Sequence, residues 1–74
     1  MKPEEFKRIR TKFELSQEQL AAVLGLSGRK VISHFESGVR NPSKLAAAFL
    51  RLLDNIPRKK AHALMGLLQK YMEK

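Results

Sequence analysis

Apolar residues return at helical spacing along most of the chain, and the first segment shows the pattern clearly. Phe6, Ile9 and Phe13 lie three or four positions apart with charged residues between them, which puts them on one face of a helix. Pro3 suits the first turn of that helix, and the two glutamates after it complement the positive end of the helix dipole. The pattern predicts an amphipathic helix over about residues 3–13.

The second predicted helix is marked at both ends. Ser16, followed three residues later by Gln19, forms a capping box in which each side chain satisfies a free backbone N–H of the other residue. Leu20 and Leu24 continue the apolar face. Gly25 can adopt the left-handed conformation that ends a helix.

Three further helices are predicted, with short connections. The third begins at Ser27 or Gly28 and stops at Gly38, the fourth is capped by residues 41–43, and the fifth starts at Pro57. No segment alternates with the two-residue period of a strand. The sequence therefore predicts an all-α fold of five short helices. The apolar positions expected on the last three helices are Ile32 and Phe35, then Leu45, Phe49, Leu52 and Leu53, then Ala61, Leu64, Leu67, Leu68 and Tyr71.

Length and composition narrow the possible functions. With 74 residues, the chain is predicted to be one small domain over residues 1–74, too small for a deep substrate cleft. It contains no cysteine, so close helix packing and dimerisation must replace disulfides and thiolate metal sites. The charged N-terminus and the absence of a long apolar run predict a cytoplasmic protein that does not enter the membrane.

The charge balance points to a polyanionic partner. Fifteen Lys and Arg against seven Asp and Glu give a net charge of +8 and a pI near 10.3. Such an excess favours nucleic acid first and an anionic membrane surface second. Net charge alone does not separate a DNA-binding surface from a well-solvated one, so the positions of the charges must decide.

The most specific pattern is LSQEQLAAVLGLS at residues 15–27, followed by FESG at residues 35–38 and RNP at residues 40–42. Ala21 is small where the second helix must cross the third closely, and Gly25 permits the sharp turn between them. This pattern resembles the XRE family, the lambdoid repressor and Cro type of helix-turn-helix. The resemblance covers about residues 5–55 and implies a five-helix lambda-repressor-like DNA-binding fold. A simple helical hairpin without DNA contacts is the alternative.

One departure from the family pattern affects the third helix. From Gly25 to Glu36 the chain has one residue more than the usual spacing. We expect Gly28 to absorb the extra residue in the turn. Val31 lies outside the Ile32 and Phe35 face, and we expect it to fill the gap that the insertion leaves rather than to contact a thymine methyl.

The resemblance implies that the third helix lies in the major groove of double-stranded DNA. Its outward residues Arg29, Lys30, Ser33 and His34 are then candidate base contacts, because Arg and Lys can donate to guanine O6 and N7. Phosphate contact by Arg29 and Lys30 is an equal alternative. The phosphate contacts that the resemblance implies are Gln17, Ser37, Arg40, Asn41 and Lys44.

The remaining polar residues suggest structural roles rather than catalysis or metal binding. The resemblance implies an ion pair between Arg10 and Glu36, which would fix geometry more than it adds stability. His34 has only His62 as a fellow histidine and no carboxylate at ligand spacing, so we expect no metal site. No catalytic set of residues and no phosphate-binding glycine loop is present, so we expect neither enzyme activity nor a cofactor.

The predicted C-terminal helix, about residues 57–73, carries more apolar surface than a lone small domain has to cover. Such an excess suggests a protein partner, and two-fold symmetry is the common solution. The alternative is that the helix completes the core of the monomer. The residues expected in a homodimer interface are Leu64, Leu67, Leu68, Tyr71 and Met72.

These observations favour a homodimeric transcriptional repressor that reads a pseudo-palindromic operator. An alternative is the antitoxin component of a toxin–antitoxin pair, which binds a toxin and regulates its own operon. Membrane-surface binding by the C-terminal helix is the weakest hypothesis, because its basic residues Arg58, Lys59 and Lys60 cluster at one end instead of lining a face.

Overall fold

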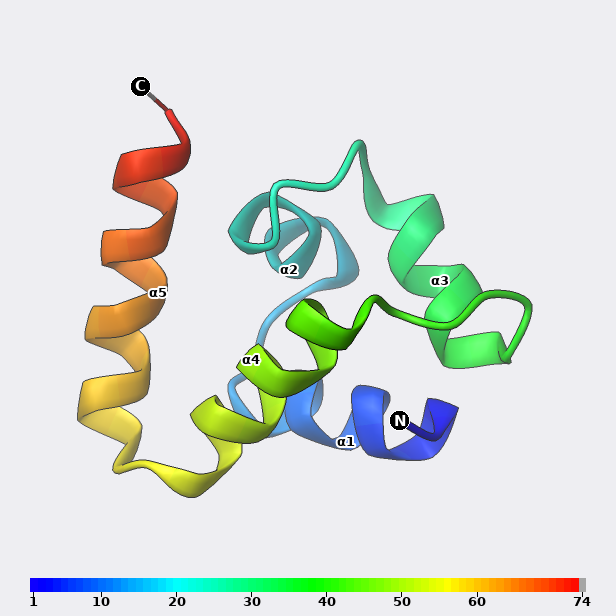
Figure 1. The fold of residues 1–74 in the computed structure, drawn as a ribbon, viewed down its shortest axis with the longest axis horizontal. Helices are drawn as coiled ribbons and strands as arrows, with labels where there is room; N and C mark the ends of the chain where they lie inside the picture. Colours follow the sequence, from blue (N-terminus) through cyan, green and yellow to red (C-terminus); the bar gives the residue numbers. More distant parts are fainter. Residues whose placement is uncertain (74) are drawn as a thin grey trace.

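The computed structural model describes residues 1–73, which form five helices and no strand. The helices are α1 (Pro3–Lys12), α2 (Gln17–Val23), α3 (Arg29–Ser37), α4 (Lys44–Asn55) and α5 (Arg58–Met72) (Figure 1). This architecture confirms the all-α fold predicted from the sequence. None of these five helices is long and apolar enough to cross a membrane.

The helix ends follow the capping signals in the sequence. The Ser16 hydroxyl accepts a hydrogen bond from the Gln19 backbone N–H at 3.0 Å, and the Gln19 side chain accepts one from the Ser16 N–H at 2.8 Å. Ser43 caps α4 by accepting from the Ala46 N–H at 3.1 Å. Gly25 and Gly38 both have positive φ, +68° and +83°, as the ends of α2 and α3 require.

The core is built where α1, α2, α3 and α4 meet. Phe6 and Ile9 of α1 are fully buried, and the Phe6 ring meets the Phe35 ring edge-on at 5.4 Å between centroids. Burial of such aromatic and branched side chains is the main stabilising contribution in a small domain. The remaining large, fully buried side chains are Leu20, Ile32, Leu50 and Leu53.

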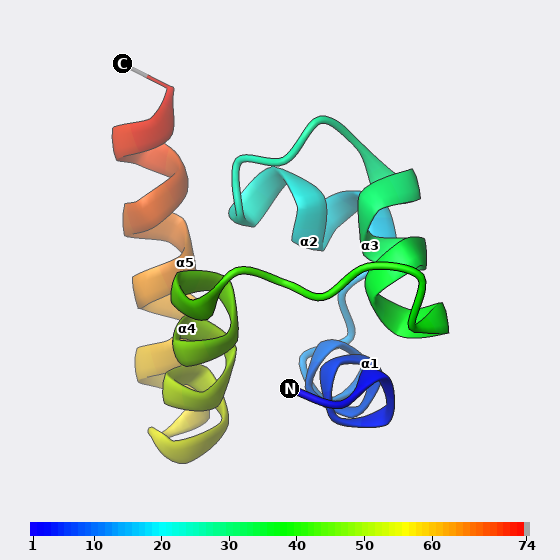
Figure 2. The ribbon, with the colours of Figure 1, turned by 45° about the vertical axis from the view of Figure 1, so that its right-hand side comes forward.

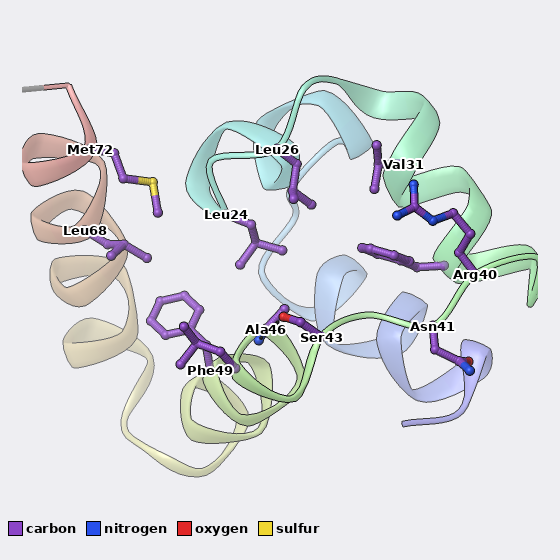
Figure 3. Close-up of a pocket in the computed structure, with 12 residues that line it drawn as sticks. Leu24, Leu26, Val31, Arg40, Asn41, Ser43, Ala46, Phe49, Leu68 and Met72 are labelled. Atoms are coloured by element: carbon purple, nitrogen blue, oxygen red, sulfur yellow. Dashed lines mark hydrogen bonds between the residues drawn. The ribbon is translucent and has the colours of Figure 1, made fainter.

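The five helices divide into two groups. Helix α3 packs against α2 and α1, and Figure 2 shows α1 nearly end-on beneath the other two. Helix α4 packs on α1, and α5 packs on both α4 and α2. In Figures 1 and 2 α5 stands at one side of the molecule, and its C-terminal half faces the end of α2, where Met72 lies close to Gly25. A largely apolar cavity lies between that half of α5, the end of α2 and the start of α4 (Figure 3).

The apolar face expected for α4 is only partly the one that packs. Leu53 is buried as predicted, but Leu45 is 80% exposed and Leu52 is 47% exposed. The side that packs carries Ala47 and Leu50 instead. The reason is that α4 is apolar on nearly every side, so helical spacing alone does not single out the face that meets α1 and α5.

The apolar residues of α5 divide between the core and the surface. Ala61 and Met65 are buried in the core. Leu64 and Leu68 are half-buried against it. The other three residues expected in a dimer interface are exposed: Leu67, Tyr71 and Met72.

Candidate nucleic-acid interface

The outward side of α3 carries four exposed polar residues: Arg29, Lys30, Ser33 and Ser37. With about 100° of rotation per residue, they lie within roughly a 100° sector of the helix. The opposite side is anchored by the buried Ile32 and Phe35. The core therefore fixes which side of α3 faces solvent.

Helix α3 begins directly after the turn that follows α2. Gly28 immediately precedes the helix in an extended conformation, and Arg29 is the first helical residue. Val31 is half-buried and lines the apolar cavity instead of the exposed side. Arg29 and Lys30 thus occupy the first turn of α3 with their side chains in solvent.

The segment after α3 adds further polar and basic groups beside that face. Arg40, Asn41 and Lys44 are all exposed. The Arg40 backbone N–H donates to the His34 carbonyl at 3.2 Å, which holds the loop against the end of α3. Arg40 therefore lies close to the end of α3, and Asn41 and Lys44 follow it along the chain.

Among residues 1–73, the side chains of Arg29, Lys30, Arg40 and Lys44 make no hydrogen bond or ion pair. We call these four residues the free basic cluster. Between residues 19 and 53 the only acidic residue is Glu36, and Glu36 is already paired with Arg10. The cluster therefore keeps its full positive charge available for an anion. This long stretch with a single acidic residue can be read from the sequence. It marks where unpaired basic residues lie, which the net charge of the whole chain does not show.

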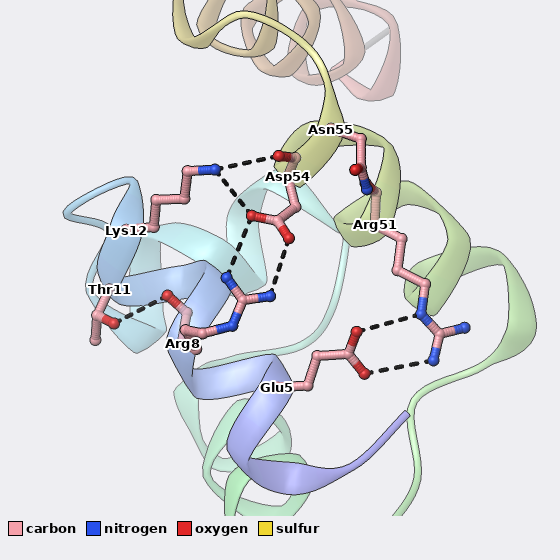
Figure 4. A network of polar contacts seen from close by, with 7 residues as sticks. All are labelled: Glu5, Arg8, Thr11, Lys12, Arg51, Asp54 and Asn55. Carbon is pink, nitrogen blue, oxygen red and sulfur yellow. Dashed lines mark hydrogen bonds and ion pairs between the residues drawn. The ribbon is translucent and has the colours of Figure 1, made fainter.

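Several basic residues elsewhere are neutralised by acids, most visibly between α1 and α4 (Figure 4). Asp54 accepts from Arg8 and from Lys12, each at 2.9 Å, and Glu5 pairs with Arg51 at 3.4 Å. The hydrogen bonds from Arg8 and Lys12 lower the pKa of Asp54 to about 2, and the hydrogen bond to Asp54 raises the pKa of Arg8. These basic residues hold α1 to α4.

A helix-turn-helix family model matches residues 6–50, which is the stretch from α1 to α4 that carries this geometry. The chain belongs to the helix-turn-helix family, in its XRE branch. It is a DNA-binding transcription regulator. A comparison with curated proteins and one with solved structures found no match.

In this helix-turn-helix protein, α2 and α3 are the two helices of the motif, joined by residues 24–28. The family match ends at residue 50. It therefore leaves the end of α4 and the whole of α5 outside the part that the family shares.

A polar cluster around Glu36 of α3 ties the first three helices together. Arg10 donates to Glu36 at 2.5 Å and 3.1 Å, and their side chains are only 13% and 7% exposed. Gln17 donates its amide N–H to Glu36 at 3.1 Å. Arg10 also donates to the Leu15 carbonyl at 2.8 Å. The Arg10–Glu36 pair therefore fixes the angle between α1 and α3.

Two of the residues expected to contact DNA already use their side chains in hydrogen bonds within the protein, and a third is partly buried. Gln17 uses one of its two amide hydrogens on Glu36, which leaves the other for a phosphate. The Ser37 hydroxyl donates to the His34 carbonyl at 3.3 Å. His34 is half-buried, whereas Ser33 is exposed. Within residues 1–73, no group of three or more His, Asp or Glu side chains is placed to hold a metal ion.

Proposed function

We propose that this helix-turn-helix protein is a sequence-specific repressor that binds double-stranded DNA as a homodimer, with α3 in the major groove. The free basic cluster is the observation that supports this proposal. It combines positive charge, exposure and a position on and beside α3, whereas Arg8, Lys12 and Arg51 on α1 and α4 are paired with acids. Unpaired basic side chains on one face are what phosphate neutralisation needs.

The four residues of the cluster would have two different tasks. Arg29 and Lys30 open α3, so they would reach base edges, together with Ser33 and the more buried His34. Arg40 and Lys44 follow α3, so they would contact flanking phosphates along with Asn41, Ser37 and the free amide hydrogen of Gln17. Base contacts would supply the selectivity and phosphate contacts most of the affinity.

The homodimer would form through the exposed apolar side of α5. Leu67 and Tyr71 lie four positions apart and are 53% and 67% exposed, so they share a face of the helix. Leu64, Leu68 and Met72 would complete the interface at its edge. A two-fold dimer would present two copies of α3 to successive major grooves, as a pseudo-palindromic operator requires.

The same apolar face also fits a second candidate function. An antitoxin needs a surface for its toxin outside the DNA-binding motif, and the exposed part of α5 lies outside the family match. Sedimentation of the isolated chain separates the two functions. A homodimer at low micromolar concentration supports the repressor, and a monomer supports a role for α5 in binding a different protein.

Selection of duplexes from a random library, followed by salt titration, tests the proposed function. We expect the selected sequences to contain two inverted half-sites about 34 Å apart. With ~6–10 phosphate contacts per dimer, affinity should fall steeply as salt rises. Lys44→Ala should flatten the slope by about one unit per lost contact. Arg51→Ala removes the same charge from a paired residue and should leave it unchanged. Absence of an enriched sequence, or a slope near zero, would contradict the proposal.

A further inference from the structure

The apolar cavity of Figure 3 has the size of a small-molecule site. Its volume is about 440 Å³, within the range of roughly 300–1,000 Å³ that is typical of such sites. It is bounded by the end of α2, the inner side of α3, the loop after α3, the start of α4 and the end of α5. No acidic residue lines it.

The two ends of the cavity differ in character. One end is formed by Leu24, Phe49, Leu68 and Met72, and it is apolar. The other end lies next to α3 and the loop after it, where Arg40, Asn41 and Ser43 supply the only polar side chains of the lining. Figure 3 shows Arg40 and Asn41 across the space from Phe49, Leu68 and Met72, with Ser43 between them beside Ala46. A ligand that fits both ends has an apolar tail and a polar head.

The side chains at the polar end of the cavity determine which charge the polar head of a ligand should carry. The Arg40 guanidinium is directed back toward the Val31 side of the cavity, whereas the Asn41 amide is directed away from it (Figure 3). Within residues 1–73, no carboxylate pairs with Arg40. Ser43 already accepts from the Ala46 N–H. A planar guanidinium without a partner favours an anionic head, and it can hold a carboxylate through two parallel hydrogen bonds.

We propose that this cavity binds a free amphipathic carboxylate, with its aliphatic tail between α2, α4 and α5 and its head on Arg40, and that binding releases DNA. The second part rests on the proposed function, because Arg40 is there a phosphate contact. One guanidinium does not hold a ligand carboxylate and a DNA phosphate together. The cavity is also lined by Val31 and Phe35 from the inner side of α3, so an occupant presses directly on the helix that enters the groove.

Calorimetric titration of the DNA-free protein with decanoate, below the concentration at which it forms micelles, tests the binding site. We expect decanoate to bind. Decanol keeps the tail and loses the charge, so it should bind at least about tenfold more weakly. Butyrate keeps the charge and loses most of the tail, and it should show no measurable binding. Equal binding of decanol and decanoate would overturn the assignment of Arg40.

Substitutions locate the site. Ala46→Phe fills the cavity and should abolish decanoate binding, whereas Ala48→Phe adds the same ring at an exposed position of α4 and should not. Circular dichroism checks that both variants fold. Met72→Trp fills the cavity from the last residue of α5, where the side chain is 45% exposed, and gives the same test if Ala46→Phe does not fold. Unchanged decanoate binding in a folded, cavity-filled variant overturns the proposal.

The effect of the ligand on DNA binding is measured with the duplex obtained from the library selection. Decanoate at saturation should weaken binding of that duplex by about tenfold, a usual size for coupling between two sites, and should not change duplex binding by the cavity-filled Ala46→Phe variant. If the protein binds no duplex at all, the proposed function fails, and the calorimetry alone decides on the cavity. If decanoate does not bind and filling the cavity dissociates a dimer, the cavity accepts a second copy of the chain and the proposal is wrong.

Discussion

At the scale of single residues, replacing Gly25 and replacing Gly66 should change the stability of the protein in opposite directions. Gly25 has φ +68° at the end of α2, where a side chain is strained. Gly66 lies inside α5 with nothing within 4 Å of an added Cβ. We expect Gly25→Ala to destabilise the protein by about 1–2 kcal/mol and Gly66→Ala to stabilise it by roughly 0.5–1 kcal/mol.

Chemical denaturation of both glycine variants measures the two effects. Met72 contributes little to the cost at Gly25, because the added Cβ would meet only its flexible end at 2.9 Å. Met72→Ala combined with Gly25→Ala should therefore leave most of the Gly25→Ala cost in place. Equal effects of the two glycine substitutions would show that the left-handed turn does not limit stability.

Arg29 is the residue that we expect to recognise a base pair in each half-site. It is the first residue of α3 and is exposed, so it can reach two guanine acceptors at once, which is worth ~1–3 kcal/mol of discrimination. Arg29→Ala should relax the preference at one base pair in each half-site. Lys44→Ala should instead weaken all sequences alike. Binding to a set of single-base operator variants measures both, and uniform weakening by Arg29→Ala would mean that Arg29 contacts phosphate and leaves base reading to Lys30.

The sequence was enough to predict which residues of α3 are exposed. It was not enough to predict the hydrogen bonds that some of the expected DNA contacts make within the protein. Counting from Ile32 and Phe35 is enough to place Arg29 and Lys30 outward, because one helix has one core side. The bond from Gln17 to Glu36 could not be predicted in the same way. It depends on how α2 and α3 pack, and the spacing along the chain does not contain that angle.

At the scale of elements, the contact between α1 and α4 should respond to acid. The pKa of Asp54 is lowered from 3.8 to about 2 by its hydrogen bonds with Arg8 and Lys12. A lowered carboxyl pKa contributes stability that is complete above the unfolded value and is lost as the pH falls through the folded value. Asp54→Asn should therefore destabilise the protein at neutral pH, and the difference from wild type should shrink between pH of about 4 and about 2.

Urea unfolding at several pH values measures this difference. Glu18→Gln is the matched control, because Glu18 is exposed and forms no ion pair within residues 1–73. Its difference from wild type should stay nearly constant over the same pH range. A pH-independent effect of Asp54→Asn would show that the ion pairs between α1 and α4 do not stabilise the fold.

The ends of the helices were easier to predict than their buried faces. Ser16, Gly25 and Ser43 act through local hydrogen bonds and backbone angles, so a few neighbouring residues determine them. Which side of α4 is buried depends on its neighbours instead. Because α4 is apolar nearly all round, the choice of Ala47 over Leu45 is made by the shapes of α1 and α5 rather than by the sequence of α4.

At the scale of the whole molecule, the proposed function assigns separate roles to two regions. The family match covers α1 to α3 and most of α4, where the core fixes α3 and the free basic cluster lies on α3 and in the segment that follows it. Helix α5 adds Ala61 and Met65 to the core and leaves Leu67 and Tyr71 exposed. Loss of the exposed part of α5 should therefore change assembly and affinity without disturbing the motif.

Leu67→Glu tests whether that exposed part forms the dimer. Leu67 is 53% exposed, so a glutamate there remains solvated in the monomer but is buried in a dimer. Sedimentation should show a monomer, and circular dichroism should show unchanged helix content. Affinity for the selected operator should fall by about a hundredfold or more, because two linked DNA-binding domains bind far more tightly than one.

Gly66→Glu is the control, because it adds the same charge about 100° around the helix, and it should remain a dimer. A dimeric Leu67→Glu would place the interface elsewhere, and an unfolded one would mean that Leu67 stabilises the monomer.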